Sequence, residues 1–214
     1  MYMRSTSSPT TAKGFTLLEL LIVIAIIAIL ATILVIVINP VETLRRARDV
    51  QRLSDLSSVR TAIAMYMTVT PNPQLGECAL TPSNPTNRIV YLSQDAATTT
   101  VAGVVYAGTD VTAVDGTGWI PVNFSAIAGG SPLAALPLDP SQASTFDVND
   151  IATSTPIYRY ACSDAPLAFE LTARLESIAY GDVDVDEGGT NKMATDGGDS
   201  SDLYEVGTNL LIID

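Results

Sequence analysis

Residues 13–38 read KGFTLLELLIVIAIIAILATILVIVI. Only three of the 24 residues from 15 to 38 are polar, namely Thr16, Glu19 and Thr32. A helix of that length measures about 36 Å, which is enough to cross a hydrocarbon layer of about 30 Å. Because a helix in a soluble core is rarely apolar on every side, the sequence predicts that residues 15–38 span a membrane.

The composition argues against several classes of protein. The chain has 214 residues, no histidine, 11 basic and 23 acidic residues, and a formal net charge of −12. A catalytic set or a metal site that uses imidazole is therefore excluded. Duplex binding relies on Lys and Arg to neutralise phosphates, so we expect no contact with nucleic acid. The acidic residues leave room for a catalytic carboxylate pair, but no motif indicates one, and we do not expect an enzyme.

The segment that precedes the apolar run is a leader of 14 residues, in which Arg4 and Lys13 are the only charges. A secretory signal has an apolar stretch of about 7 to 15 residues followed by a small-residue cleavage site. Here the run is longer and ends at Asn39-Pro40, so we expect it to stay in the protein. The positive-inside rule alone would keep the part after the run in the cytoplasm, because five arginines follow it: Arg45, Arg46, Arg48, Arg52 and Arg60.

The two cysteines favour the opposite orientation. Cys78 and Cys162 lie 84 positions apart and have no neighbouring cysteine that would make a redox or zinc motif. A disulfide between them would stabilise the fold by about 4 to 5 kcal/mol in the chain-entropy model, but it would require an oxidising compartment. Two buried free thiols are the alternative.

The start of the apolar run resembles the class III signal of type IV pilins and type II secretion pseudopilins. That signal has a basic residue, Gly, Phe, Thr, Leu, an aliphatic residue and Glu, and the matching residues here are Lys13, Gly14, Phe15, Thr16, Leu17, Leu18 and Glu19. The resemblance implies that a prepilin peptidase cuts after Gly14 on the cytoplasmic side and that the new amino terminus of Phe15 is methylated. It also implies that the C-terminal part faces outward, which resolves the conflict over orientation.

Glu19 needs a physical reason, because a carboxylate inside an apolar run costs about 3 kcal/mol on insertion scales. In one account it lies in the first helical turn, where the helix dipole favours negative charge and the headgroups keep it hydrated. The resemblance implies a second account, in which Glu19 pairs with the ammonium of Phe15 on a neighbouring subunit. In hydrocarbon that attraction is little screened and would set the register of a filament.

The helix is expected to continue beyond the membrane run to about Met67, because Pro40 is the sole proline between residues 15 and 70 and no glycine occurs there. Pro40 predicts a kink or a melted segment over residues 36–41. Beyond it, apolar residues recur at every third position from 41 to 62 and so wind around the helix, as suits a helix that meets sister helices and then its own head. The charged pairs at spacings of three or four, Arg45/Asp49, Arg46/Asp49, Asp49/Arg52 and Arg52/Asp55, predict a solvated face. A weaker alternative is attraction to acidic heads of neighbouring subunits.

The remaining chain predicts an α+β fold, in which the long N-terminal helix packs against a C-terminal antiparallel sheet. We expect a leader at 1–14, a membrane-spanning and filament-core helix at 15–38, its extramembrane continuation at 39–70, and a globular head at 71–214. Strand-prone runs occur at 88–92, 101–106, 119–122, 157–162 and 167–175, the last two forming a hairpin around residues 163–166. Residues 136–140, which read LPLDP, are also similar to a pattern of major pseudopilins.

The acidic C-terminal region suggests one candidate for a metal site. Residues 182–186 are not an EF-hand, because Glu187 and Met193 replace the glycine and the acid that such a loop requires. Asp196, Asp199 and Asp202, in a loop with the flexible glycines Gly197 and Gly198, are similar to the calcium loop of major pseudopilins, and calcium is the expected cofactor. A solvated acidic loop without metal is the alternative.

Two functions remain after these exclusions. The first is a structural subunit of a type IV pilus or type II secretion pseudopilus, whose partners would be its own copies, the prepilin peptidase, an assembly platform protein and a motor ATPase. It would reside in the cytoplasmic membrane before assembly and then in a surface or periplasmic filament. The second is a membrane-anchored extracytoplasmic binding module that does not polymerise. An anchor has no use for Gly14-Phe15 or for Glu19, so these residues favour the first function.

Overall fold

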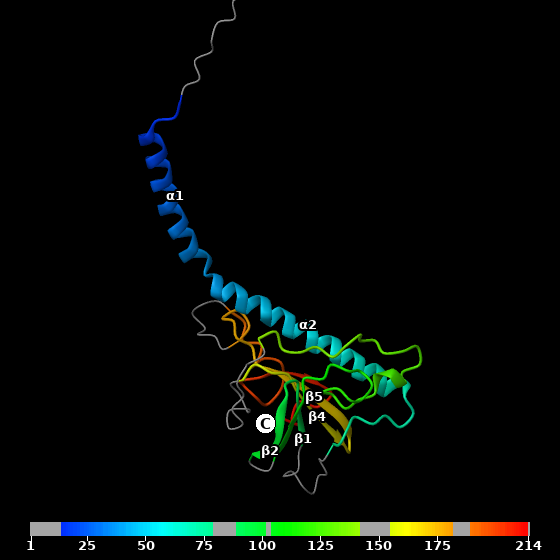
Figure 1. The fold of residues 1–214 in the computed structure, drawn as a ribbon. Coiled ribbons are helices and arrows are strands. Elements are labelled where there is room, and N and C mark those ends of the chain that lie inside the picture. The colour runs from blue at the N-terminus through cyan, green and yellow to red at the C-terminus, as the bar shows by residue number, and fades with distance from the viewer. Residues whose placement is uncertain (1–13, 79–88, 102–103, 142–154, 182–188, 214) are drawn as a thin grey trace, which may run out of the picture. The chain divides into compact units, whose positions relative to one another are not determined.

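The computed structural model, drawn in Figure 1, describes residues 14–78, 89–101, 104–141, 155–181 and 189–213. The chain divides into two compact units, residues 1–43 and 44–214. Each unit is described by itself below.

The apolar run forms helix α1, Leu17–Ile38. Its residues from 17 to 35 form a helix that is long and apolar enough to cross a membrane. Every α1 side chain that the structure describes is exposed. The predicted span is therefore present as a helix with an apolar surface on all sides.

The helix breaks at Asn39, as the sequence predicts from Pro40. Asn39 adopts a left-handed conformation with φ of 43° and ends α1, and helix α2, Pro40–Val69, begins at the next residue. Proline suits the first position of a helix because its missing N–H has no partner there in any case. The Asn39 side chain then accepts a hydrogen bond from the Glu42 backbone N–H at 3.3 Å. One residue thus caps the end of the first helix and the start of the second, which runs to Val69, two residues beyond the expected end.

The head packs on one stripe of α2. The buried residues recur at spacings of three and four, which places them on a single face: Asp49, Arg52, Leu56, Val59, Ala62, Ile63 and Tyr66. The apolar residues of the first turns, Val41, Leu44 and Val50, stay exposed. Of the apolar residues that recur at every third position, only those from Leu56 onward are buried in the core of the head.

The head contains a sheet of six strands: β1 Ile89–Leu92, β2 Ala96–Val101, β3 Val104–Gly108, β4 Arg159–Asp164, β5 Leu167–Ala173 and β6 Tyr204–Gly207. Their order across the sheet is β2-β3-β1-β4-β5-β6. Figure 1 shows α2 passing over these strands. The expected antiparallel sheet requires one correction, because β1 and β3 pair in parallel. The chain reaches β3 through β2, which lies beyond it at the edge, so β3 returns in the same direction as β1.

The predicted strands agree with the sheet in part. The β4–β5 hairpin is confirmed, with Ser163 opposite Ala168, and β1 lies where expected. The run at 101–106 falls on two strands: Val101 ends β2 and Val104 begins β3, while residues 102–103 lie outside the described part of the chain. The run at 119–122 is wrong as a strand: it forms a buried loop in which the Trp119 indole N–H donates to the Pro137 carbonyl at 3.0 Å. Pro121, inside this loop, has no N–H to give to a ladder.

A disulfide joins Cys78, in the segment that follows α2, to Cys162 on β4. This confirms the predicted pairing and makes the free-thiol alternative wrong. The Tyr160 hydroxyl donates to the Leu75 carbonyl at 2.7 Å beside the disulfide, and both tyrosine and disulfide lie in the main core. The segment after α2 is thereby fastened to the centre of the sheet.

Candidate functional site

The predicted processing point lies in an open part of the chain. Phe15 is 85% exposed, and a Cβ added at Gly14 would meet no atom within 4 Å. Nothing in the described fold therefore requires a glycine at position 14.

Glu19 lies in the first turn of α1 and closes a capping box with Thr16. The Glu19 Oε2 accepts hydrogen bonds from the Thr16 backbone N–H and from the Thr16 hydroxyl, both at 2.9 Å, while the Glu19 N–H donates to the Thr16 Oγ1 at 3.2 Å. Such a box satisfies backbone donors that the start of a helix leaves without partners. The carboxylate is thus held at the start of the helix. Phe15, whose amino group would become an ammonium on cleavage, lies four residues before it.

A second polar centre, absent from the sequence prediction, fastens α2 to the head. Arg52 is fully buried, and its Nε and Nη2 donate to the two carboxylate oxygens of Asp139 at 2.7 and 2.9 Å. Its Nη1 donates to Asp49 Oδ1 at 2.8 Å, and Asp49 in turn accepts from the backbone N–H groups of Glu176 and Ser177 at 3.0 and 2.7 Å. The guanidinium therefore joins the helix to two separate loops.

The expectation that these charged pairs form a solvated face is wrong for Asp49 and Arg52. Burial alone would lower the pKa of Arg52, but its hydrogen bond to Asp139 and the negative charges around it raise that pKa above the usual value, so the guanidinium stays charged. A buried charge needs such partners, because an unpaired one would be very costly. The LPLDP segment, noted above only for its resemblance, supplies the carboxylate of Asp139.

The predicted calcium residues are arranged differently from a metal site. Asp196 uses both oxygens on backbone N–H groups, accepting from Gly198 at 3.0 Å and from Glu205 at 2.7 Å. Asp199 and Asp202 are exposed. Among the described residues, no group of three or more His, Cys, Asp or Glu side chains could hold a metal ion. Calcium binding by this loop stays a prediction, and residues 182–186 lie outside the described part of the chain.

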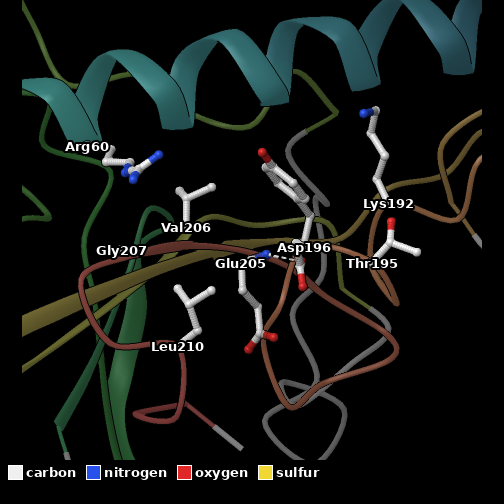
Figure 2. A pocket seen from close by; sticks show the side chains of 9 residues that line it. Arg60, Lys192, Thr195, Asp196, Glu205, Val206, Gly207 and Leu210 are labelled. Carbon is white, nitrogen blue, oxygen red and sulfur yellow. Dashed lines mark hydrogen bonds between the residues drawn. The ribbon is translucent and has the colours of Figure 1, made fainter.

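Asp196 instead lines a pocket of about 300 Å³ beside β6, which Figure 2 shows from close by. Arg60 and Lys192 contribute positive charge to it, and Glu205 comes from the strand. The loop backbone passes so close to this strand that a Cβ at Gly198 would overlap the Glu205 Oε2. The acidic loop therefore folds over β6.

Two buried glutamates, Glu170 on β5 and Glu205 on β6, share one face of the sheet, and the sequence prediction missed both. Glu170 is opposite Gly207, and Glu205 is opposite Thr172. The Glu170 Oε2 accepts from the backbone N–H groups of Ile212 and Ile213 at 2.7 and 2.8 Å. The pKa of Glu170 is raised to about 9, mainly by burial and then by the neighbouring carboxyl of Glu205, although the two N–H donors lower it. The folded pair therefore keeps a proton at neutral pH.

This pair predicts a head that is more stable in mild acid than in base. Because the folded pKa of Glu170 exceeds the unfolded value of about 4.5, the folded state binds a proton that the unfolded state lacks, and stability falls as the pH rises from about 4.5 to 9. Glu170→Gln should flatten this slope and raise the free energy of unfolding at pH 8 by about 1 to 2 kcal/mol. Thermal unfolding followed by circular dichroism between pH 5 and 9 measures both. The exposed Glu77→Gln is the matched control, and an unchanged slope in Glu170→Gln would contradict the assignment.

Comparison with known proteins identifies the N-terminal element. No curated protein and no solved structure matches the chain. A family model, the prokaryotic N-terminal methylation motif, matches residues 10–35, which include Gly14, Phe15 and Glu19. The motif is typical of structural pilins and pseudopilins and is not an enzymatic one. Residues 10–35 therefore carry the N-terminal methylation motif, which is the class III prepilin signal of type IV pilins and pseudopilins.

Proposed function

We propose that this protein is the structural subunit of a type IV pilus or type II secretion pseudopilus filament. The subunit is cleaved after Gly14, methylated on the amino group of Phe15, and polymerised through α1. One observation carries the proposal: a helix that is exposed and apolar on every described side begins with a carboxylate fixed next to the cleavage signal.

The physical argument starts from the surface of α1. In a bilayer, lipid covers an apolar helix, and no carboxylate is needed for that purpose. Outside the bilayer the same surface requires protein around it, and the α1 helices of neighbouring copies supply matching apolar surfaces. An ammonium on Phe15 of one copy and the carboxylate of Glu19 on another would then fix the axial position of the two helices.

The partners and location follow from this role. Before assembly the subunit is anchored in the cytoplasmic membrane with its head outside, where an oxidising compartment suits the disulfide between Cys78 and Cys162. A membrane platform protein and a cytoplasmic motor ATPase would drive its extraction into the filament. The membrane-anchored binding module that does not polymerise would use the same helix, but Glu19 would then serve only the capping box with Thr16.

Processing is tested by mass spectrometry of the N-terminal peptide from the membrane fraction of cells that express the full chain. We expect a peptide that begins with N-methylated Phe15, because the signal places the junction in exposed chain. Cells that lack prepilin peptidase are the control and should retain the leader. A peptide that still carries Met1 in cells with the peptidase would contradict the proposed maturation.

A further inference from the structure

One short motif of the sequence has no part in the proposed function. Residues 123–125 read Asn-Phe-Ser, which fits the pattern Asn-X-Ser/Thr with a middle residue other than proline, and they are the only such triplet in the chain. Residues 84–86 read Asn-Pro-Thr and are excluded by their proline. In secreted proteins this pattern marks asparagines that accept N-linked glycans. Because three residues recur by chance in many chains, the structural setting of the triplet has to carry the argument.

The middle residue of the triplet is an anchor, and the residues on either side of it face water. Phe124 is fully buried, and its ring packs edge-on against Tyr66 of α2, with 6.2 Å between the ring centroids. The Phe124 N–H donates to the Val114 carbonyl at 2.8 Å. Asn123 and Ser125 are both exposed. The fold of the head thus fixes the triplet and presents its two polar residues at the surface.

The Asn123 side chain has no structural task in the described part of the head. Asn123 is the N-cap residue of the short 3-10 helix η1, Phe124–Ala126, a position where an asparagine usually accepts a hydrogen bond from the helix backbone. Here its side chain makes no capping bond. Among the residues that the structure describes, neither the Asn123 amide nor the Ser125 hydroxyl has a hydrogen-bond partner. Both groups are therefore available to an enzyme.

The surface next to Asn123 leaves room for a bulky group. Residues 123–130 carry no charge, and apart from the buried Phe124 and Ile127 all of them are exposed. The exposed residues after Asn123 in this segment are serine, alanine or glycine. A Cβ added at Gly129 or Gly130 would meet no atom within 4 Å. A hydrated glycan therefore fits here without displacing a packed side chain.

We propose that Asn123 carries an N-linked oligosaccharide. The inference rests on the outward-facing head of the proposed function, because the pattern is used in proteins that leave the cytoplasm, and it is independent of polymerisation. The modifying enzyme is a membrane-bound oligosaccharyltransferase that recognises the asparagine together with the Ser125 hydroxyl.

The donor in this reaction is an oligosaccharide joined through a phosphate ester to a membrane lipid. The Asn123 Nδ2 attacks the anomeric carbon of the first sugar, and a C–N bond forms while the C–O bond to the phosphate breaks. The lipid phosphate leaves with the bonding electron pair, and one Nδ2 proton passes to a base of the transferase. The product is a neutral amide that bears the sugar on the surface of the head.

The test is mass spectrometry of the protein isolated from the cells that encode it. The protease Asp-N cuts before aspartate and releases residues 115–138, which contain the triplet. We expect this peptide to be heavier than its sequence by the mass of an oligosaccharide, and fragmentation to place the sugar on Asn123. Asn123→Gln and Ser125→Ala should each lose the whole mass shift, the second with the asparagine still present. Ser125→Thr, which keeps the hydroxyl, should retain it.

Asn209→Gln is the matched control, because Asn209 belongs to the same head but is followed by two leucines. The 115–138 peptide of this variant should keep its sugar. An unmodified peptide, whether or not residues 1–14 have been removed, would overturn the inference, as would a sugar attached to Ser125 or a mass shift that survives in Ser125→Ala. Modified subunits that form no filaments would count only against the proposed function.

Discussion

Replacing Glu19 by alanine should leave membrane insertion and processing intact and reduce filament yield at least tenfold. Insertion should even become easier, because a carboxylate inside the apolar run costs about 3 kcal/mol. Assembly should fail because the ammonium of Phe15 on a neighbouring copy would lose its partner in a medium that screens charge weakly. Immunoblots of the membrane fraction and of material sheared from the cell surface measure the two quantities.

The capping box makes a sharper variant available. Glu19→Gln keeps an oxygen that can accept from the Thr16 N–H and hydroxyl, so it preserves the start of α1 while removing the charge. If charge pairing drives assembly, this variant should fail as Glu19→Ala does. Thr32→Ala, which removes a polar group from the same helix without touching its start, is the control and should assemble normally. Normal filament yield in Glu19→Gln would show that capping alone explains the carboxylate.

Arg52→Met should destabilise the head by about 3 to 5 kcal/mol, because it leaves the carboxylates of Asp49 and Asp139 buried without their counter-charge. For a head of this size that loss corresponds to a fall in Tm of roughly 10 °C. Thermal unfolding of the purified full chain in detergent, followed by near-UV circular dichroism, measures it. Ser57→Ala, on the exposed side of the same helix, should change stability by less than about 0.5 kcal/mol. A similar Tm for Arg52→Met and the wild type would show that the buried centre does not hold α2 to the head.

The functional end of the molecule could be predicted almost entirely from the sequence, because its signals are local. The apolar run, the residues from Gly14 to Glu19 and the break before Pro40 each depend on neighbours within a few positions, and the structure has α1 and its end where the sequence places them. The β4–β5 hairpin is also local, since its turn residues lie directly between its strands.

The head could not be predicted to the same depth, because its polar contacts join distant parts of the chain. From the sequence, Arg52 is expected to pair with Asp49 on the helix surface. In the structure it also donates two hydrogen bonds to the carboxylate of Asp139, 87 positions away. Glu205 lies in a strand of only four residues, which is too short to show an alternation of apolar and polar residues in the sequence. Its role emerges only when β6 pairs with β5 and brings it beside Glu170. Local spacing carries no information about such pairings.

Mature subunits, each beginning at a methylated Phe15, should polymerise through α1. Electron microscopy of material sheared from the cell surface, combined with mass spectrometry of the N-terminal peptide from the same filaments, examines both steps at once. We expect thin filaments whose subunits begin at N-methylated Phe15 and which are absent when this chain is deleted. This expectation would be contradicted if the protein were found only as single membrane-anchored chains that retain residues 1–14.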